Sequence, residues 1–130
     1  MRSLSGSHEA GLRSQFEVES AVMPGVRLRI WEVTLDRRIE LTRQIYGLAA
    51  EQEYHAAEAN EAGRAAAALA NLRAQAVVLR WGLASVSGLL VDGEEVTAAD
   101  FTERAPEALA LEALAAIQKA SGLTPGERKN

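Results

Sequence analysis

The sequence predicts a mainly α-helical protein with a small β part: an N-terminal β-hairpin, then a helical hairpin or bundle, and a C-terminal helix. Three patterns support this fold class. Apolar and polar residues alternate near the N-terminus, as is typical of strands. Eleven of the 21 residues from 56 to 76 are alanine, the strongest helix former. Apolar residues then recur every three or four positions from 69 to 86, which is the spacing of one helix face.

The β-hairpin is expected at residues 15–33. Val26, Leu28 and Ile30 alternate with arginines, so one side of the second strand is expected to be buried. The preceding Pro24-Gly25 pair predicts a type II turn, because proline presets φ and glycine supplies the positive φ that follows. Two strands alone are marginally stable in water, so the hairpin must pack on the helices or extend another sheet.

Four helices are expected, at about 36–59, 64–87, 98–104 and 106–121. Thr34 or Asp36 can cap the first helix, whose Ile39, Ile45, Leu48 and Ala49 are assigned to one face. Asn60 to Gly63 is the expected break between the first two helices. We favour a helical hairpin there, with one continuous rod as the alternative.

The chain between the second and last helices contains shorter signals. Val91-Asp92-Gly93 predicts a small hairpin or loop. Thr97 and Asp100 have the spacing of a capping box for the third helix. Pro106 suits the first position of the last helix, and Gly122 suits its end.

Length and composition indicate one domain at residues 15–123, with flexible tails at 1–14 and 124–130. Of the 130 residues, 48% are hydrophobic but only 5% are aromatic. The core is therefore thin, which favours elongated helices or an obligate partner. The net charge of −4 provides no general attraction to nucleic acid. The absence of cysteine excludes disulfides and thiolate chemistry.

No targeting or membrane segment is expected. Met1 to Ser7 lacks the apolar core of a signal peptide. No apolar run approaches the ~20 residues that are needed to cross a bilayer. We therefore expect the protein to stay in the cytoplasm where it is made.

No catalytic residue, metal ligand or cofactor is expected. His55 has Glu51 and Glu58 on the same predicted helix face, a spacing that metal ligands can use. A carboxylate-bridged metal needs a second such cluster, and the chain offers no histidine on a matching helix. We interpret these three residues as a solvated surface. The nucleophile-elbow and phosphate-loop motifs are also missing from the sequence.

The candidate binding surface is a row of apolar residues on the second predicted helix. This leucine row consists of Leu69, Leu72, Ala76, Leu79, Leu83 and Val86. The helix from 69 to 86 would be about 27 Å long, and a row this regular is expected to meet another helix of the chain or of a partner. Trp81 lies beside the row and has two interpretations. Either Gly82 allows a close approach and Trp81 is part of the core, or Trp81 anchors a partner. The predicted partner-binding residues are Leu69, Leu72, Leu79, Trp81, Leu83 and Val86.

Several short motifs, taken in order, carry a family resemblance. They are Met23-Pro24-Gly25-Val26, Arg37 to Arg43, Leu79-Arg80-Trp81-Gly82-Leu83, Gly88 to Glu94, Ala105-Pro106-Glu107-Ala108-Leu109 and Gly122 to Asn130. Their order over about residues 17–130 resembles the tail assembly chaperones of tailed bacteriophages and prophages. The alanine-rich stretch from 56 to 76 departs from that family by its smaller side chains.

The resemblance implies a non-enzymatic role in the cytoplasm of the bacterial host. Proteins of this family bind the long helical tape measure protein and keep it soluble while tail tube subunits polymerise around it. The implied partner is therefore a tape measure or tail tube protein. No catalytic residue and no cofactor are implied, and a homo-oligomer stays open.

Two other functions stay open. One is a structural component of the virion, in the tail, neck or baseplate, whose hairpin extends the sheet of a neighbouring protein. The other is a small nucleic-acid-binding regulator that uses Arg37, Arg38 and Arg43, with Arg27 and Arg29 nearby. Acidic residues interrupt this basic stripe, whereas binding to phosphates needs a cleaner basic face.

Overall fold

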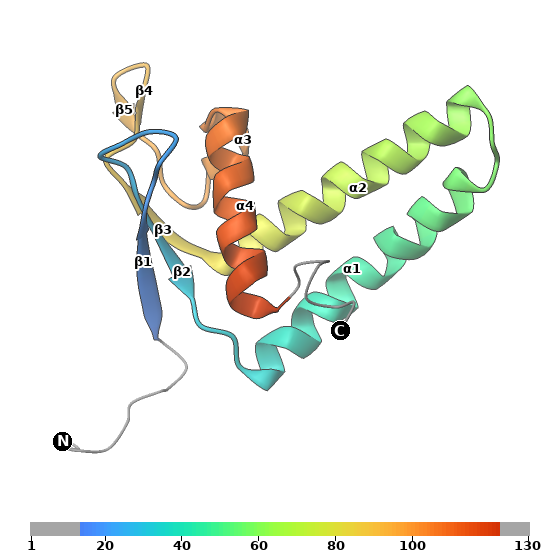
Figure 1. The fold of residues 1–130 in the computed structure, drawn as a ribbon, viewed down its shortest axis with the longest axis horizontal. Helices are drawn as coiled ribbons and strands as arrows, with labels where there is room; N and C mark the ends of the chain where they lie inside the picture. The colour runs from blue at the N-terminus through green and yellow to red at the C-terminus, as the bar shows by residue number, and fades with distance from the viewer. Residues whose placement is uncertain (1–13, 123–130) are drawn as a thin grey trace.

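The computed structural model describes residues 14–122 and has two regions (Figure 1). The base contains a three-stranded sheet, a two-stranded hairpin and two shorter helices, α3 (Phe101–Arg104) and α4 (Glu107–Ser121). The arm is a pair of long helices, α1 (Leu35–Ala56) and α2 (Glu61–Gly82), that run side by side away from the sheet (Figure 1). The predicted fold class, mainly α-helical with a small β part, is confirmed.

The sheet is antiparallel, with strand order β1-β2-β3. The predicted hairpin forms from β1 (Gln15–Glu19) and β2 (Arg27–Trp31). In its turn, the Val26 N–H donates to the Met23 carbonyl at 3.0 Å, and Gly25 has φ +98°. These features are those expected of a type II turn. β3 (Leu83–Ser87) pairs with β2 and supplies the third strand that a lone hairpin lacks.

The arm is a helical hairpin, so the alternative of one continuous rod is wrong. α1 (Leu35–Ala56) begins after Thr34, whose hydroxyl accepts from the Arg37 N–H at 3.3 Å. α2 (Glu61–Gly82) begins after Asn60, whose side chain accepts from the Gly63 N–H at 2.6 Å. A Cβ at Gly63 would lie 2.5 Å from the carbonyl oxygen of His55. Glycine therefore allows the two helices to meet closely at the end of the arm.

The prediction of a helix over 64–87 is wrong beyond Gly82, because Leu83–Ser87 is β3. The register explains the error. Ile30 is paired with Leu83 and Arg29 with Ser85, so the pairing passes over Ala84 in a bulge. As a result the buried residues of this strand, Leu83 and Val86, lie three apart. That spacing imitates a helix.

The remaining elements follow the predicted order. The small hairpin forms from β4 (Leu90–Val91) and β5 (Glu94–Glu95). α3 (Phe101–Arg104) begins later than residue 98, and α4 (Glu107–Ser121) ends at Gly122, which has φ +75°. Only half of the predicted capping box forms. The carboxylate of Asp100 accepts from the backbone N–H and the hydroxyl of Thr97, whereas Thr97 caps no helical N–H.

The hydrophobic core lies where the sheet, α3, α4, the end of α2 and the side of α1 that carries Leu41 meet. Its residues are Val26, Leu28, Ile30, Leu41, Val78, Leu79, Trp81, Leu83, Val86, Leu89, Val96, Phe101, Leu109, Ala113, Leu114 and Ile117. A Cβ at Gly82 would lie 2.6 Å from Cγ2 of Ile117. Gly82 therefore allows a close approach of α4, and Trp81, which is buried, belongs to the core.

A polar contact joins α4 to the turn between β1 and β2. The carboxylate of Glu112 accepts from the Ser20 hydroxyl at 2.5 Å and from the Ala21 N–H at 2.7 Å. It also accepts from the Val22 N–H at 3.4 Å. Three donors from one turn thus hold a single carboxylate of the last helix.

The predicted tails at 1–14 and 124–130 lie outside the described residues, apart from Ser14. Within residues 14–122, no helix combines the length and the apolar character that a membrane span requires.

Candidate partner-binding surface

The predicted leucine row falls into two parts, one buried in the base and one exposed on the arm, and Trp81 beside it is buried in the base. Leu79, Trp81, Leu83 and Val86 are buried in the chain's own core. Leu69 and Leu72, further along the arm, are 48% and 54% exposed. The row is therefore not one continuous surface, because α2 ends at Gly82 and its last turn packs inside the base. Of the six predicted partner-binding residues, only Leu69 and Leu72 are accessible to a partner.

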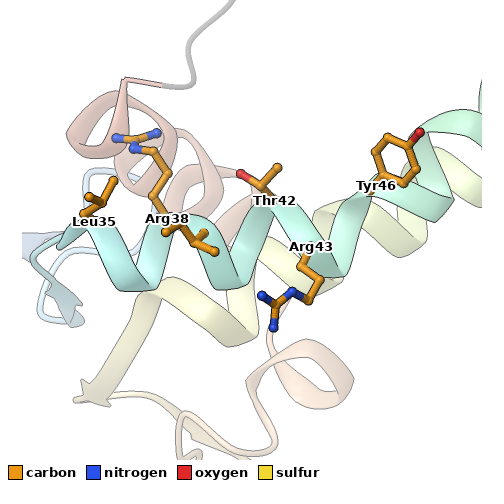
Figure 2. A pocket seen from close by; sticks show the side chains of 6 residues that line it. Leu35, Arg38, Thr42, Arg43 and Tyr46 are labelled. Atoms are coloured by element: carbon orange, nitrogen blue, oxygen red, sulfur yellow. The ribbon is translucent and has the colours of Figure 1, made fainter.

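A second apolar surface lies on α1 and was not predicted. Leu35, Ile39 and Tyr46 are 73%, 46% and 75% exposed. Their spacings of four and seven residues place them on one helix face. With Arg38, Thr42 and Arg43 they line an open hollow of about 450 Å³ (Figure 2). We call these six residues the α1 outer face.

The face assignments made for α1 from the sequence were partly wrong. Ile45 packs against the core, and Leu48 is half-buried. Ile39, which was placed on the same face, is exposed. The i, i+4 pair Leu35 and Ile39 is the signal that could have shown a second apolar face. The sequence does not predict this face because the first predicted helix begins at about residue 36, after Leu35.

Two arginines flank the apolar side chains of the α1 outer face. Arg38 donates to the carbonyl oxygen of Ser121, which ties its guanidinium to the end of α4. Arg43 is exposed and makes no ion pair with another residue of 14–122. The surface is therefore apolar with a cationic border. It is complementary to a partner whose apolar stripe is accompanied by acidic side chains.

A pair of tryptophans fixes the orientation of this face. The Arg37 guanidinium carbon lies 5.7 Å from the ring centre of Trp31 and 5.0 Å from that of Trp81. The Trp81 indole N–H donates to the Arg37 carbonyl at 2.9 Å, and the Arg37 guanidinium donates to the Trp81 carbonyl. These cation–π and hydrogen-bonding contacts join the first turn of α1 to the last turn of α2.

The basic stripe considered for nucleic acid is largely engaged within the chain. Arg27 and Arg29 lie 3.7 and 3.5 Å from the carboxylate of Glu17. Arg37 lies between the tryptophans, and Arg38 contacts Ser121. Four of the five arginines therefore contribute to internal contacts, and they form no continuous basic face.

The histidine cluster lies near the far end of the arm. Nε2 of His55 is 3.7 Å from Glu51, and Nδ1 is 3.7 Å from Glu58. Within residues 14–122, no group of three or more histidine and acidic side chains has an arrangement suited to a metal ion. The trio joins α1 to the connection that precedes α2.

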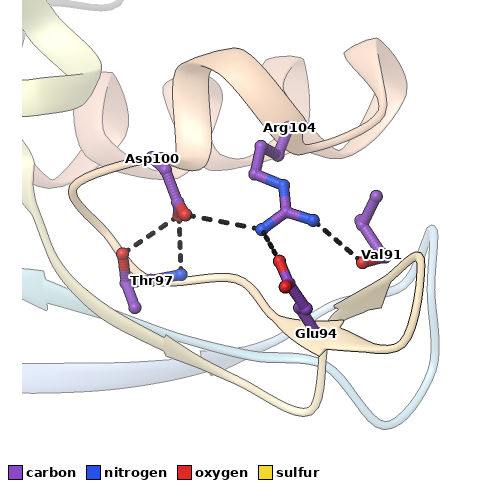
Figure 3. Close-up of polar contacts among 5 residues, drawn as sticks. All are labelled: Val91, Glu94, Thr97, Asp100 and Arg104. Atoms are coloured by element: carbon purple, nitrogen blue, oxygen red, sulfur yellow. Dashed lines mark hydrogen bonds and ion pairs between the residues drawn. The ribbon is translucent and has the colours of Figure 1, made fainter.

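A second polar cluster joins the small hairpin to α3 (Figure 3). Arg104 donates to the Val91 carbonyl at 2.9 Å, lies 3.1 Å from Glu94 and lies 3.7 Å from Asp100. Hydrogen bonding by the Thr97 backbone N–H lowers the pKa of Asp100, with smaller contributions from the Thr97 hydroxyl and Arg104. This cluster is a structural contact between two short elements.

Comparisons of the chain with protein-family models, with curated proteins and with solved structures find no match.

Proposed function

We propose that this protein is a non-enzymatic tail assembly chaperone of a tailed bacteriophage or prophage, and that it binds the tape measure protein through the α1 outer face. The observation that carries the proposal is the exposure of Leu35, Ile39 and Tyr46 on one side of a well-anchored helix. The motif resemblance supplies the identity of the partner. The surface supplies the mode of binding.

The α1 outer face suits a helical partner. From residue 35 to 46 it extends about 17 Å along the helix, or three turns. An amphipathic helix can lay its apolar stripe along such a face, contacting it at i, i+3, i+4 and i+7 positions. A tape measure protein of this family is a long amphipathic helix that aggregates until its tube forms. Covering its apolar stripe would keep it soluble.

The charges beside the face favour one class of segment. Arg43 makes no ion pair with another residue of 14–122, so its guanidinium can pair with a carboxylate of the partner. We therefore expect the bound helix to carry glutamate or aspartate beside its apolar stripe. Leu69 and Leu72 offer a smaller apolar contact on α2 for a second part of the same partner.

Co-expression with the tape measure protein from the same tail gene region tests this proposal. The tagged full-length chain is expected to recover the tape measure protein in the soluble fraction. Ile39→Asp should reduce that recovery about tenfold, because it places a charge in an apolar contact. Leu111→Asp is the matched control, since Leu111 is 47% exposed on α4 while Ile39 is 46% exposed on α1.

Comparing the two variants shows whether loss of binding comes from the α1 outer face or from adding a charge at any exposed apolar position. Loss with Ile39→Asp and retention with Leu111→Asp would support the proposal, provided that both variants keep the wild-type circular dichroism spectrum. Equal recovery of the tape measure protein by both variants, or none by the wild type, would overturn it.

A structural component of the virion is the second candidate, and the free edge of β1 favours it. β1 is one of the two edge strands of the sheet within residues 14–122, the other being β3, so it could extend a neighbour's sheet. Mass spectrometry of purified particles separates the two functions. A chaperone is absent from finished virions, whereas a structural component is present in them.

A further inference from the structure

The outer edge of β1 exposes backbone hydrogen-bonding groups. The Ser20 N–H donates to the Val26 carbonyl, and the Glu32 N–H donates to the Ser14 carbonyl. Because pairing alternates along an antiparallel strand, even-numbered residues of β1 face β2. The N–H and C=O groups of Gln15, Glu17 and Glu19 therefore point away from the sheet, where residues 14–122 provide no further strand (Figure 1).

An apolar hollow lies beside this edge. Phe16 and Val18 of β1 line it together with Ala116, Lys119 and Ala120 of α4, and its volume is about 570 Å³. Phe16 and Val18 are half-buried and pack against the core. A strand added next to β1 would place every second side chain over this hollow. The strand edge can supply main-chain hydrogen bonds and the hollow can accept alternate side chains, which are the two features of a site for β-strand addition.

The charges at the edge specify the segment further. On the other face of the sheet, Glu17 is paired with Arg27 and Arg29, whereas Glu19 makes no ion pair with any residue of 14–122. Lys119 is an exposed cation at the hollow, and it makes no ion pair there either. The edge therefore presents one free carboxylate on its outer face and one free ammonium at its apolar side.

We infer that β1 accepts an extended segment of a partner protein as a fourth strand. The segment carries apolar residues at alternate positions for the hollow, a lysine or arginine that faces Glu19, and a carboxylate that reaches Lys119. This surface is separate from the α1 outer face, so the inference does not depend on the proposed chaperone function, and it specifies the segment that would occupy the β1 edge considered for the second candidate.

A second copy of the chain is a poorer occupant of the same edge. Two β1 strands related by a two-fold axis at Glu17 would place Glu17 opposite Glu17 and Gln15 opposite Glu19. Glu17 is already paired with Arg27 and Arg29 in each copy, but Glu19 would meet the uncharged Gln15 and gain no cation. A segment with a lysine or arginine opposite Glu19 is therefore the better occupant.

The test uses a labelled eight-residue peptide in which lysine and valine alternate and which ends in a free carboxylate. A second peptide has glutamate in place of lysine. Binding to the full-length chain is measured by fluorescence anisotropy, and the site is located by NMR hydrogen exchange. The lysine peptide should protect the amides of Gln15, Glu17 and Glu19, and leave the exchange of those of Phe16 and Val18 unchanged.

A charge reversal at the edge tests the specificity. Glu19→Lys should weaken binding of the lysine peptide about tenfold and strengthen binding of the glutamate peptide by a similar factor. Glu103→Lys changes the net charge equally at an exposed position of α3 and should change neither affinity comparably.

Three results would overturn the inference. One is protection of the odd-numbered amides before any peptide is added, because residues 1–13 or a second copy would then occupy the edge. Another is peptide-induced protection that lies outside β1. The third is an equal effect of Glu19→Lys and Glu103→Lys on binding.

Discussion

The base and the arm use apolar residues in opposite ways. The base buries large side chains such as Leu28, Phe101 and Ile117 almost completely. Along α2, by contrast, the only buried residues before Val78 are Gly63 and Ala70. Along α1 the buried residue is Leu41, and other large side chains of the two helices, such as Tyr54 and Leu72, are left exposed. Alanine supplies helix propensity without much packing volume, so the arm can present apolar residues that a core would otherwise bury.

The largest expected difference between the base and the arm is in the free energy of unfolding that is lost when an aromatic side chain is replaced by alanine. Trp81→Ala should lower the free energy of unfolding by about 3–5 kcal/mol, because it opens a cavity and frees Arg37. Tyr46→Ala, at 75% exposure on α1, should change it by less than about 0.5 kcal/mol. Urea denaturation of both variants measures this contrast. Equal losses would mean that the arm is packed as tightly as the base.

The next largest difference in stability is expected between alanine substitutions at two glycines, Gly82 in the base and Gly47 in the arm. Gly82→Ala would force a Cβ against Ile117 and should cost about 1–3 kcal/mol. Gly47 lies within α1 with nothing within 4 Å of an added Cβ. Gly47→Ala should therefore stabilise the protein by about 0.5–1 kcal/mol. Thermal unfolding followed by circular dichroism should show melting temperatures that move in opposite directions, and a shift in the same direction would contradict the packing described here.

Glu112 makes a smaller and pH-dependent contribution to the base. Burial raises its pKa, but the Ser20 hydroxyl and the N–H groups of Ala21 and Val22 outweigh burial, so the pKa is lowered from its ordinary value of 4.5. The stabilisation is therefore complete above pH 4.5 and is lost as the pH falls below it through the folded-state pKa. Glu112→Gln should cost about 1 kcal/mol at pH 7.

The pH dependence of that cost distinguishes the effect of the negative charge of Glu112 from the effect of its side-chain size and shape, which glutamine shares. Chemical denaturation at pH 7 and at pH 3 should show a smaller difference in stability between wild type and Glu112→Gln at the lower pH. If the difference in the free energy of unfolding between wild type and Glu112→Gln is the same at both pH values, the ionised carboxylate does not stabilise the turn.

The smallest effect on stability is expected in the exposed part of the leucine row. Leu69→Ala should change the free energy of unfolding by less than about 0.5 kcal/mol, because its side chain is half exposed. The same variant should reduce recovery of the tape measure protein modestly, by about twofold to fivefold. Denaturant titration and co-expression give the two measurements. A stability loss above about 2 kcal/mol would mean that Leu69 belongs to a core.

Local signals in the sequence were enough to predict most of the fold. Pro24-Gly25 predicted the hairpin turn, and Thr34, one of the two caps considered, precedes α1. The break expected at Asn60 to Gly63 predicted the two-helix arm, although α2 begins at Glu61 and includes Gly63. Each depends on backbone chemistry within a few residues. The fate of Leu83 and Val86 depends instead on pairing with Ile30 and Leu28, more than 50 positions away. A bulge gave those two residues helical spacing, so periodicity alone assigned them to the wrong element.

The candidate site was predictable only in part. Leu69 and Leu72 were chosen as part of a regular row, and the structure leaves them accessible. Leu79 belongs to the same predicted row, and Trp81 lies beside it as a possible partner anchor, yet both are buried. The difference arises because α4 covers the end of α2, which the sequence does not indicate. Leu35 and Tyr46 were missed because their exposure depends on which side of α1 faces the base.

Hydrogen exchange of the full-length chain, alone and in complex with the tape measure protein, tests most directly whether the α1 outer face is the binding surface. The account predicts that added protection is greatest over residues 35–46, is weaker near residues 69–72, and is absent from β2 and β3. Protection that appears mainly in the base, or a complex that leaves residues 35–46 unchanged, would contradict it.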